Sequence, residues 1–127
     1  MVTRLPELPE VETMCRGIAS VVGRTIVGAG RLPCKRRPIA VTPGPAGWKS
    51  RVIGQKIDRI DRVGKRVVVV LENQERVVFE PRMTGLVLLA EPPTNEHLRF
   101  QLDLSTSKSP LQLRFWDRRG LGSVRLY

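Results

Sequence analysis

The residues best placed for chemistry stand near the start of the chain, in the stretch Leu5-Pro6-Glu7-Leu8-Pro9-Glu10-Val11-Glu12-Thr13. Part of this stretch fits the first turn of a helix, because proline suits the first helical position and carboxylates favour the positive end of the helix dipole. That interpretation accounts for Pro9 and Glu10. It leaves Pro6 and Glu7 unexplained, so these two residues are the first candidates for a chemical role.

The same stretch resembles the opening of the formamidopyrimidine-DNA glycosylases, whose mature chains begin Pro-Glu-Leu-Pro-Glu-Val-Glu-Thr. The resemblance implies that the secondary amine of Pro6 attacks the anomeric carbon of a damaged nucleotide and forms a Schiff base. An α-amine with a pKa of about 8 is neutral at pH 7 far more often than a lysine with a pKa of about 10.4. Glu7 then matches the family's acid/base carboxylate. Glu10 matches a second carboxylate near the site, and a helix-start acid is an equally good interpretation.

Five residues, Met1 to Leu5, precede Pro6, and an acylated proline nitrogen cannot attack carbon. We therefore expect residues 1–5 to be a leader that is not native. Initiation at a leucine-type codon for Leu5, followed by methionine removal, would free Pro6, and proteolysis after Leu5 is a second route. The alternative is a catalytically inactive DNA-binding module derived from the same fold.

Two internal segments match the family more weakly. Lys65, in a Gly-Lys turn, corresponds to a lysine that contacts the phosphate near the lesion, and an ordinary solvated hairpin charge is the alternative. Met83, in Phe79–Gly85, corresponds to a side chain that fills the gap left by the flipped nucleotide, and packing at a strand end is the alternative. Glu80 stands where the family has a phosphate-contacting histidine, which is a departure from the pattern.

The stretch Phe115-Trp116-Asp117-Arg118-Arg119-Gly120-Leu121-Gly122 resembles the family loop Asn-Asp-Pro-Arg-Arg-Phe-Gly. Without gaps, Arg119 matches the arginine that faces the orphaned base, whose acceptors a guanidinium can satisfy. Leu121 then falls on the family's wedge phenylalanine, and Gly120 replaces its second arginine. A shift of one residue would instead pair Arg118 and Arg119 with the double arginine, so both registers stay open.

Composition also favours a nucleic-acid partner. The chain holds 22 lysines and arginines against 12 acidic residues, a formal net charge of +10, which attracts polyanions. A ribosomal or membrane-surface protein is the alternative on charge alone. No apolar run approaches the roughly 20 residues of a membrane helix. The two cysteines and single histidine provide neither a disulfide framework nor a structural zinc set.

Hydrophobic periodicity predicts one helix and then many short strands. Apolar residues three to four positions apart predict a helix from Pro9 to about Gly23. A basic, proline-rich loop is expected over Pro33–Pro45 and a second helix over Ala46–Val52. Strands are predicted over Thr25–Leu32, Lys56–Val63, Arg66–Leu71, Arg76–Glu80, Thr84–Ala90, Leu98–Leu104, Leu111–Trp116 and Gly122–Leu126.

This order favours a mainly β (α+β) domain, an antiparallel sandwich or barrel with a single core. The resemblance selects a two-layer antiparallel β-sandwich of about eight strands flanked by two helices, one at the N-terminus, over residues 6–127. It implies base-excision repair that removes an oxidised base and cleaves the abasic strand. The implied partner is double-stranded DNA with a damaged or abasic nucleotide, bound by a cytoplasmic bacterial monomer. The family's helix–two-turn–helix and zinc ribbon are absent from this chain, so we expect no cofactor here and a zinc ion in a C-terminal part.

Overall fold

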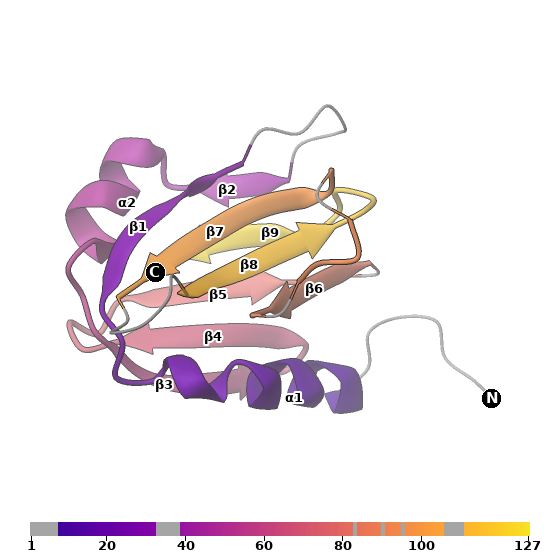
Figure 1. The fold of residues 1–127 in the computed structure, drawn as a ribbon, viewed down its shortest axis with the longest axis horizontal. Helices are drawn as coiled ribbons and strands as arrows, with labels where there is room; N and C mark the ends of the chain where they lie inside the picture. The colour runs from indigo at the N-terminus through magenta and orange to yellow at the C-terminus, as the bar shows by residue number, and fades with distance from the viewer. Residues whose placement is uncertain (1–7, 33–38, 83, 90, 95, 106–110) are drawn as a thin grey trace.

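A computed structural model describes residues 8–32, 39–82, 84–89, 91–94, 96–105 and 111–127. Pro6, Glu7 and Met83, three of the predicted site residues, lie outside this set. The described residues form a β-sandwich whose open sides are closed by two helices (Figure 1). In chain order the elements are α1 (Leu8–Gly17), the 3-10 turn η1 (Ala19–Val21), β1 (Ile26–Arg31), β2 (Ala40–Thr42), α2 (Pro45–Val52), β3 (Ile57–Val63), β4 (Arg66–Leu71), β5 (Arg76–Glu80), β6 (Gly85–Leu88), β7 (Leu98–Leu104), β8 (Leu111–Asp117) and β9 (Ser123–Leu126).

The strands form two sheets that face each other across the core. One sheet has the order β1-β7-β8-β6 and the other the order β2-β9-β5-β4-β3. Three phenylalanines join the two inner faces: the ring centroid of Phe79 on β5 lies 6.2 Å from that of Phe100 and 5.8 Å from that of Phe115. The predicted two-layer sandwich with flanking helices is confirmed.

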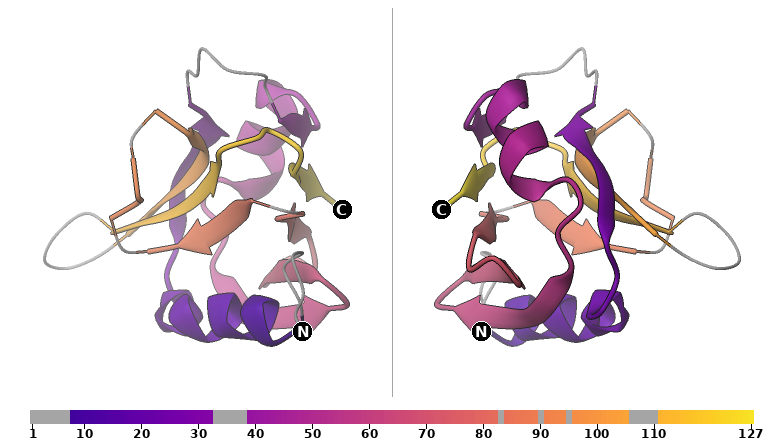
Figure 2. Two further views of the ribbon diagram at one scale, coloured as in Figure 1. Left: turned by 90° about the vertical axis from the view of Figure 1, so that its right-hand side faces the viewer. Right: turned by 90° about the vertical axis from the view of Figure 1, so that its left-hand side faces the viewer.

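Each helix closes one side of the sandwich, as the end-on views show (Figure 2). α1 packs against β3, β4 and β6 and buries Val11, with Ile18 just beyond its end. α2 packs against β1 and buries Trp48, whose ring centroid lies 4.9 Å from that of Phe100. Among the described helices, none has the length and apolarity to cross a membrane.

The prediction of one helix to about Gly23 was wrong. α1 ends at Gly17, and the 3-10 turn Ala19–Val21 follows. A 3-10 turn places residues three apart on one face, so Ile18 and Val21 are both buried. Their spacing in the sequence is therefore the same as that of buried residues in an α-helix. The reversal is completed at Gly23, whose φ of 89° favours glycine and whose N–H donates to the Ile57 carbonyl.

The expectation of an uninterrupted loop over Pro33–Pro45 was wrong at Ala40–Thr42. Residues Ala40–Thr42 form β2, a ninth strand among the described residues, and it runs parallel to β9. Three residues between prolines carry too little periodicity to predict a strand. Their pairing partner lies near the other end of the sequence, so no local pattern could indicate it.

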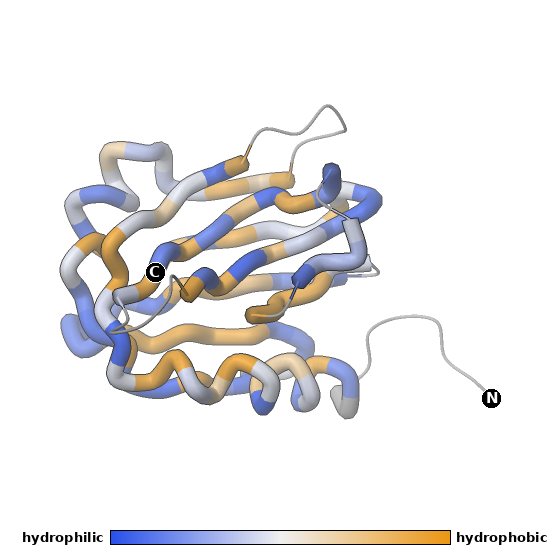
Figure 3. Tube along the Cα trace, viewed as in Figure 1, coloured by the Kyte–Doolittle hydropathy of each residue, from blue (hydrophilic) through white to orange (hydrophobic). Residues whose placement is uncertain are grey.

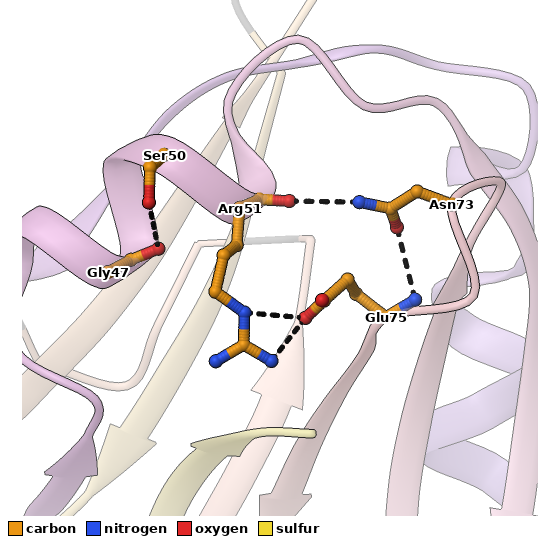
Figure 4. Close-up of polar contacts among 5 residues, drawn as sticks. All are labelled: Gly47, Ser50, Arg51, Asn73 and Glu75. Carbon is orange, nitrogen blue, oxygen red and sulfur yellow. Dashed lines mark hydrogen bonds and ion pairs between the residues drawn. The ribbon is translucent and has the colours of Figure 1, made fainter.

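At the α2 side, a polar cluster ties the helix to the β4–β5 turn (Figure 4). The guanidinium of Arg51 donates twice to Oε2 of Glu75, with the Nε contact at 2.8 Å. Asn73 bridges the same two residues: its amide donates to the Arg51 carbonyl at 3.2 Å and accepts from the Glu75 N–H at 3.0 Å. This end of the sandwich is therefore held by an ion pair and one amide.

Candidate functional site

The start of α1 and three connections all lie at the opposite end of the sandwich, the right-hand end in Figure 1. The connections are the β3–β4 turn, the β5–β6 connection and the β8–β9 connection. Strand pairing fixes their spacing, because Gly85 lies opposite Asp117 and Glu80 lies opposite Ser123. We call the first turn of α1 together with residues 64–65, 81–82, 84 and 118–122 the loop end.

A single carboxylate organises the two longer connections of the loop end. Asp117 is fully buried at the end of β8. Its Oδ1 accepts from Thr84 Oγ1 at 2.6 Å and from the Arg119 N–H at 3.2 Å. Its Oδ2 accepts from the Gly122 N–H at 2.8 Å. Asp117 therefore fixes both ends of the turn over residues 118–122 and links that turn to Thr84.

The main chain of Asp117 is held as firmly as its side chain. Its N–H donates to the His97 carbonyl at 3.0 Å, and its carbonyl accepts from Nε of Arg99 at 2.8 Å. Arg99 is only 1% exposed, so this charge-assisted hydrogen bond lies in the interior. The neighbouring Trp116 donates its indole N–H to the Thr94 carbonyl at 2.9 Å. These bonds tie the β6–β7 connection to the end of β8.

Two glycines allow close backbone approaches at this end, one between the β8–β9 connection and β5 and one within the β5–β6 connection. A Cβ on Gly122 would lie 2.6 Å from the Glu80 carbonyl oxygen and 2.7 Å from Cζ of Phe115. A Cβ on Gly85 would lie 2.5 Å from the Pro81 carbonyl oxygen, which accepts the Gly85 N–H. Real Cβ atoms do not come so close, so neither position has room for a side chain.

Five of the predicted site residues fall within the loop end. Glu10 is exposed in the first turn of α1, and Lys65 is exposed in the β3–β4 turn. Arg118 and Arg119 are exposed, and Leu121 is half-buried, in the β8–β9 connection. The main-chain N–H of Arg119 is anchored, whereas its guanidinium makes no hydrogen bond or ion pair with another described residue. The roles of all five remain predictions.

Other ionisable groups on α1 serve the scaffold. Glu12 accepts from Arg16 at 3.0 Å and from Arg62 on β3 at 3.3 Å, which fastens α1 to the sheet. Burial, and next the nearby Glu12 carboxylate, raise the pKa of the Cys15 thiol above its ordinary value. At neutral pH that thiol is therefore mostly protonated, which lowers the nucleophilicity of Cys15.

Glu80, the departure noted at the family's histidine position, is compensated locally. Its Oε1 lies 3.9 Å from Nε of Arg66 and 3.5 Å from Oγ of Ser123. Its negative charge is therefore partly offset by an arginine on the adjacent strand.

Asp117 and Thr84 were missed by reasoning from the sequence. An aspartate that ends an apolar strand and precedes a glycine-containing turn is a known signal for side-chain-to-backbone bonding, and Asp117 carries that signal. Thr84 carries none, because its partner lies on another strand. Among the described residues, no group of three or more His, Cys, Asp and Glu side chains is placed to hold a metal ion.

Residues 5–124 match the family model of the formamidopyrimidine-DNA glycosylase N-terminal domain. The chain belongs to this family. It is 38% identical to the formamidopyrimidine-DNA glycosylase of Chloroflexus aurantiacus over 125 residues, which is 96% of this chain and 43% of that protein. It is also 38% identical to the enzyme of Mycobacterium avium over 124 residues, which is 96% of this chain and 42% of that protein. The chain thus spans less than half the length of these curated relatives.

Solved structures of formamidopyrimidine-DNA glycosylases share the fold. The Lactococcus lactis enzyme, bound non-covalently to DNA containing an abasic site, superposes with a TM-score of 0.78 at 27% identity over 95% of this chain and 45% of its own. MutM in complex with DNA containing carbocyclic 8-oxo-G gives a TM-score of 0.79 at 29% identity, over 96% of this chain and 44% of its own. Both relatives were solved with DNA, which directs attention to the basic residues of the loop end.

Proposed function

We propose that this chain is the N-terminal part of a base-excision DNA glycosylase that removes an oxidised base and then cleaves the abasic strand. Family membership supports the proposal, as does the formal net charge of +10. The observation that carries it is the loop end, where a buried carboxylate holds the backbone of the β8–β9 connection and leaves Arg118 and Arg119 exposed. Guanidinium groups so placed suit phosphate oxygens and base edges.

In the proposed reaction, the target nucleotide leaves the stack and the amine of Pro6 attacks its anomeric carbon. The base departs with the electrons of the glycosidic bond and takes up a proton. The opened sugar and the proline nitrogen form an iminium, whose positive charge favours loss of a neighbouring proton and β-elimination of the 3′ phosphate. Glu7 donates a proton to the sugar oxygen and shuttles protons, with Glu10 as a second carboxylate nearby.

The remaining predicted residues hold the DNA in this proposal. Lys65 contacts a phosphate near the lesion, while Met83 and Leu121 fill the gap left by the flipped nucleotide. Arg119, or Arg118 in the shifted register, faces the orphaned base. We further propose that the protein acts as a cytoplasmic monomer, with no cofactor within residues 1–127 and a zinc ion in a C-terminal part. Metal analysis of the purified chain by mass spectrometry tests the cofactor proposal, and stoichiometric zinc would contradict it.

A second candidate, a catalytically inactive DNA-binding module, is favoured by the turn itself. Gly120 stands at the family's second arginine and has a φ of 72°, a conformation that residues with side chains rarely adopt. In the ungapped register the turn has therefore diverged from the family pattern next to Arg119, the residue matched to the arginine that faces the orphaned base.

Borohydride trapping on an oligonucleotide with one abasic site distinguishes the two candidates. A chain that begins at Pro6 should form a covalent adduct, because its amine is free. The chain that begins at Met1 serves as the matched control and should form none, because its proline nitrogen is an amide. Absence of an adduct from both, and from a longer protein that carries the C-terminal part, would assign the inactive module.

A further inference from the structure

The outer face of the five-stranded sheet carries more apolar surface than a solvent-facing sheet requires. β4 reads Arg-Val-Val-Val-Val-Leu and is hydrophobic along almost its whole length (Figure 3). Alternate residues point to opposite faces, and Val67, Val69 and Leu71 enter the core between the sheets. Val68 and Val70 therefore point outward, although they are only 4% and 1% exposed. Strands that are apolar on both faces are typical of sheets that are covered on both sides.

A groove of about 640 Å³ runs over this outer face, across β3, β4, β5 and β9. Its floor is apolar: Val68 lies opposite Val78 in the β4–β5 register, and Val63 at its rim is 57% exposed. No described helix or strand lies over it, because α1 and α2 bury their apolar residues in the core between the sheets. Val68 is nearly covered by its neighbours, so the aliphatic strip offers a ligand chiefly the exposed Val63 and the half-buried Val78.

Arginines flank the strip, and two of them have no partner among the described residues. Arg59 pairs with Asp58 and Asp61, and Arg66 lies 3.9 Å from Glu80. Arg76 on β5 and Arg125 on β9 are exposed, line the groove, and make no side-chain hydrogen bond or ion pair with any described residue.

These two arginines sit on neighbouring strands. The main chain of Arg76 exchanges two hydrogen bonds with Tyr127, which follows β9, and Arg125 on β9 precedes Tyr127 by two residues. They are therefore diagonal neighbours across the pair, and Arg125 lies directly opposite Val78 of the apolar strip. Two guanidiniums without a partner among the described residues lie beside an aliphatic floor. This arrangement fits a ligand that carries carboxylates next to aliphatic groups.

We propose that this groove binds an acidic, aliphatic peptide segment of a partner protein. Aspartate or glutamate side chains of the segment bind Arg76 and Arg125, while its leucines or valines pack on Val63 and Val78. Nucleic acid fits less well, because its bases would lack a stacking platform: Tyr127 is the groove's one aromatic residue among those described. The aliphatic floor also offers nothing to a phosphate backbone, whereas it suits leucine or valine side chains.

Fluorescence anisotropy with the 127-residue chain tests the proposal. The probe is a fluorescein-labelled peptide of about ten residues in which aspartate and glutamate alternate with leucine and glycine. Two comparison peptides carry asparagine and glutamine in place of the acids, or serine in place of the leucines. The charge-reversal variant is Arg76→Glu/Arg125→Glu. Its matched control is Arg31→Glu/Lys49→Glu, which makes the same change of net charge at exposed positions outside the groove.

We expect the acidic, aliphatic peptide to bind and both comparison peptides to bind at least about tenfold more weakly. Arg76→Glu/Arg125→Glu should weaken binding by about tenfold or more, and the control pair should change it by less than about twofold. Val78→Thr, which keeps the shape of the side chain, should weaken binding without altering the circular dichroism of the fold. Equal losses in the two charge-reversal variants would overturn the proposal. So would failure of the peptide to bind, or binding of a labelled single-stranded oligonucleotide that only the groove variant abolishes.

Discussion

At the loop end Asp117 accepts hydrogen bonds from a hydroxyl and two main-chain N–H groups, whereas at the α2 end Glu75 accepts them from the guanidinium of Arg51. The Asp117 carboxylate is fully buried, while the side chains of Glu75 and Arg51 are 24% and 38% exposed. Both carboxylates fix a connection between strands. The α2 end commits its arginine to the scaffold in doing so, and the loop end leaves its arginines available to a ligand.

The largest expected effect comes from neutralising each carboxylate in turn. Asp117→Asn keeps the shape but turns an amide toward buried donors, so it should lower the free energy of unfolding by about 2–4 kcal/mol. Glu75→Gln should lower it by about 0–1 kcal/mol, because that ion pair is partly solvated. Urea denaturation followed by tryptophan fluorescence measures both. Equal decreases would mean that the two ends are not held differently.

A smaller decrease is expected when the close approach within the loop end is disturbed. Gly122→Ala should lower the free energy of unfolding by about 1–3 kcal/mol, because its Cβ would meet main-chain and ring atoms that cannot easily move. Gly30→Ala in β1 is the control, since a Cβ there has nothing within 4 Å. It should be neutral or slightly stabilising. Thermal unfolding of both variants would show the difference, and a tolerant Gly122 would contradict the tight packing.

Removing one hydroxyl tests the link between the two longer connections. Thr84→Val should cost about 1 kcal/mol, because it removes the donor to Asp117 and one acceptor for the Arg119 N–H. Hydrogen exchange of the Arg119 amide should become faster, while that of the Glu75 amide at the α2 end should not change. Thr84→Ser keeps the hydroxyl and should behave as the native protein does. Unchanged exchange at Arg119 in the valine variant would show that Asp117 alone holds the turn.

The smallest effect on stability is expected from the arginines of the loop end. Arg118→Ala/Arg119→Ala should change the free energy of unfolding by less than about 0.5 kcal/mol, because both guanidiniums are solvated. The double variant should bind DNA more weakly. The slope of the logarithm of the binding constant against the logarithm of the salt concentration should also become shallower, by about 1 for each phosphate that an arginine no longer neutralises. Arg51→Ala should do the reverse, lowering stability and leaving DNA binding unchanged. An equal loss of DNA affinity in the Arg51 variant would contradict the proposal that the loop-end arginines bind DNA and Arg51 stabilises the fold.

Local patterns predicted most of the fold. Alternation and turn residues placed every described strand except β2 within about two residues of its observed bounds, because those strands bury one face or both. The end of α1 was misplaced because a 3-10 turn continues the same spacing of buried residues. β2 was missed because its pairing is wholly non-local.

Part of the candidate site was predicted and part was missed, because the missed part depends on contacts between residues far apart in the sequence. Glu10, Lys65, Arg118, Arg119 and Leu121 were singled out through a family resemblance, and the fold brings their elements to one end. The link between Asp117 and Thr84 could not be predicted, because Thr84 lies 33 residues earlier in the sequence and on another strand. Likewise, the outer groove emerges only when four strands are aligned side by side.

The position of β9 has a consequence for the way this domain is made. β9 holds residues from near the end of the given sequence, yet it lies between β2 and β5 within its sheet. A ribosome releases residues in order, so β2 and β5 must wait, each with an open edge, until Ser123–Leu126 emerge. Open edges invite pairing with other chains, and long-range contacts form slowly. The five-stranded sheet is therefore completed only when β9 pairs with both β2 and β5. Before that pairing, the open edges of β2 and β5 are the sites that chaperones would need to shield.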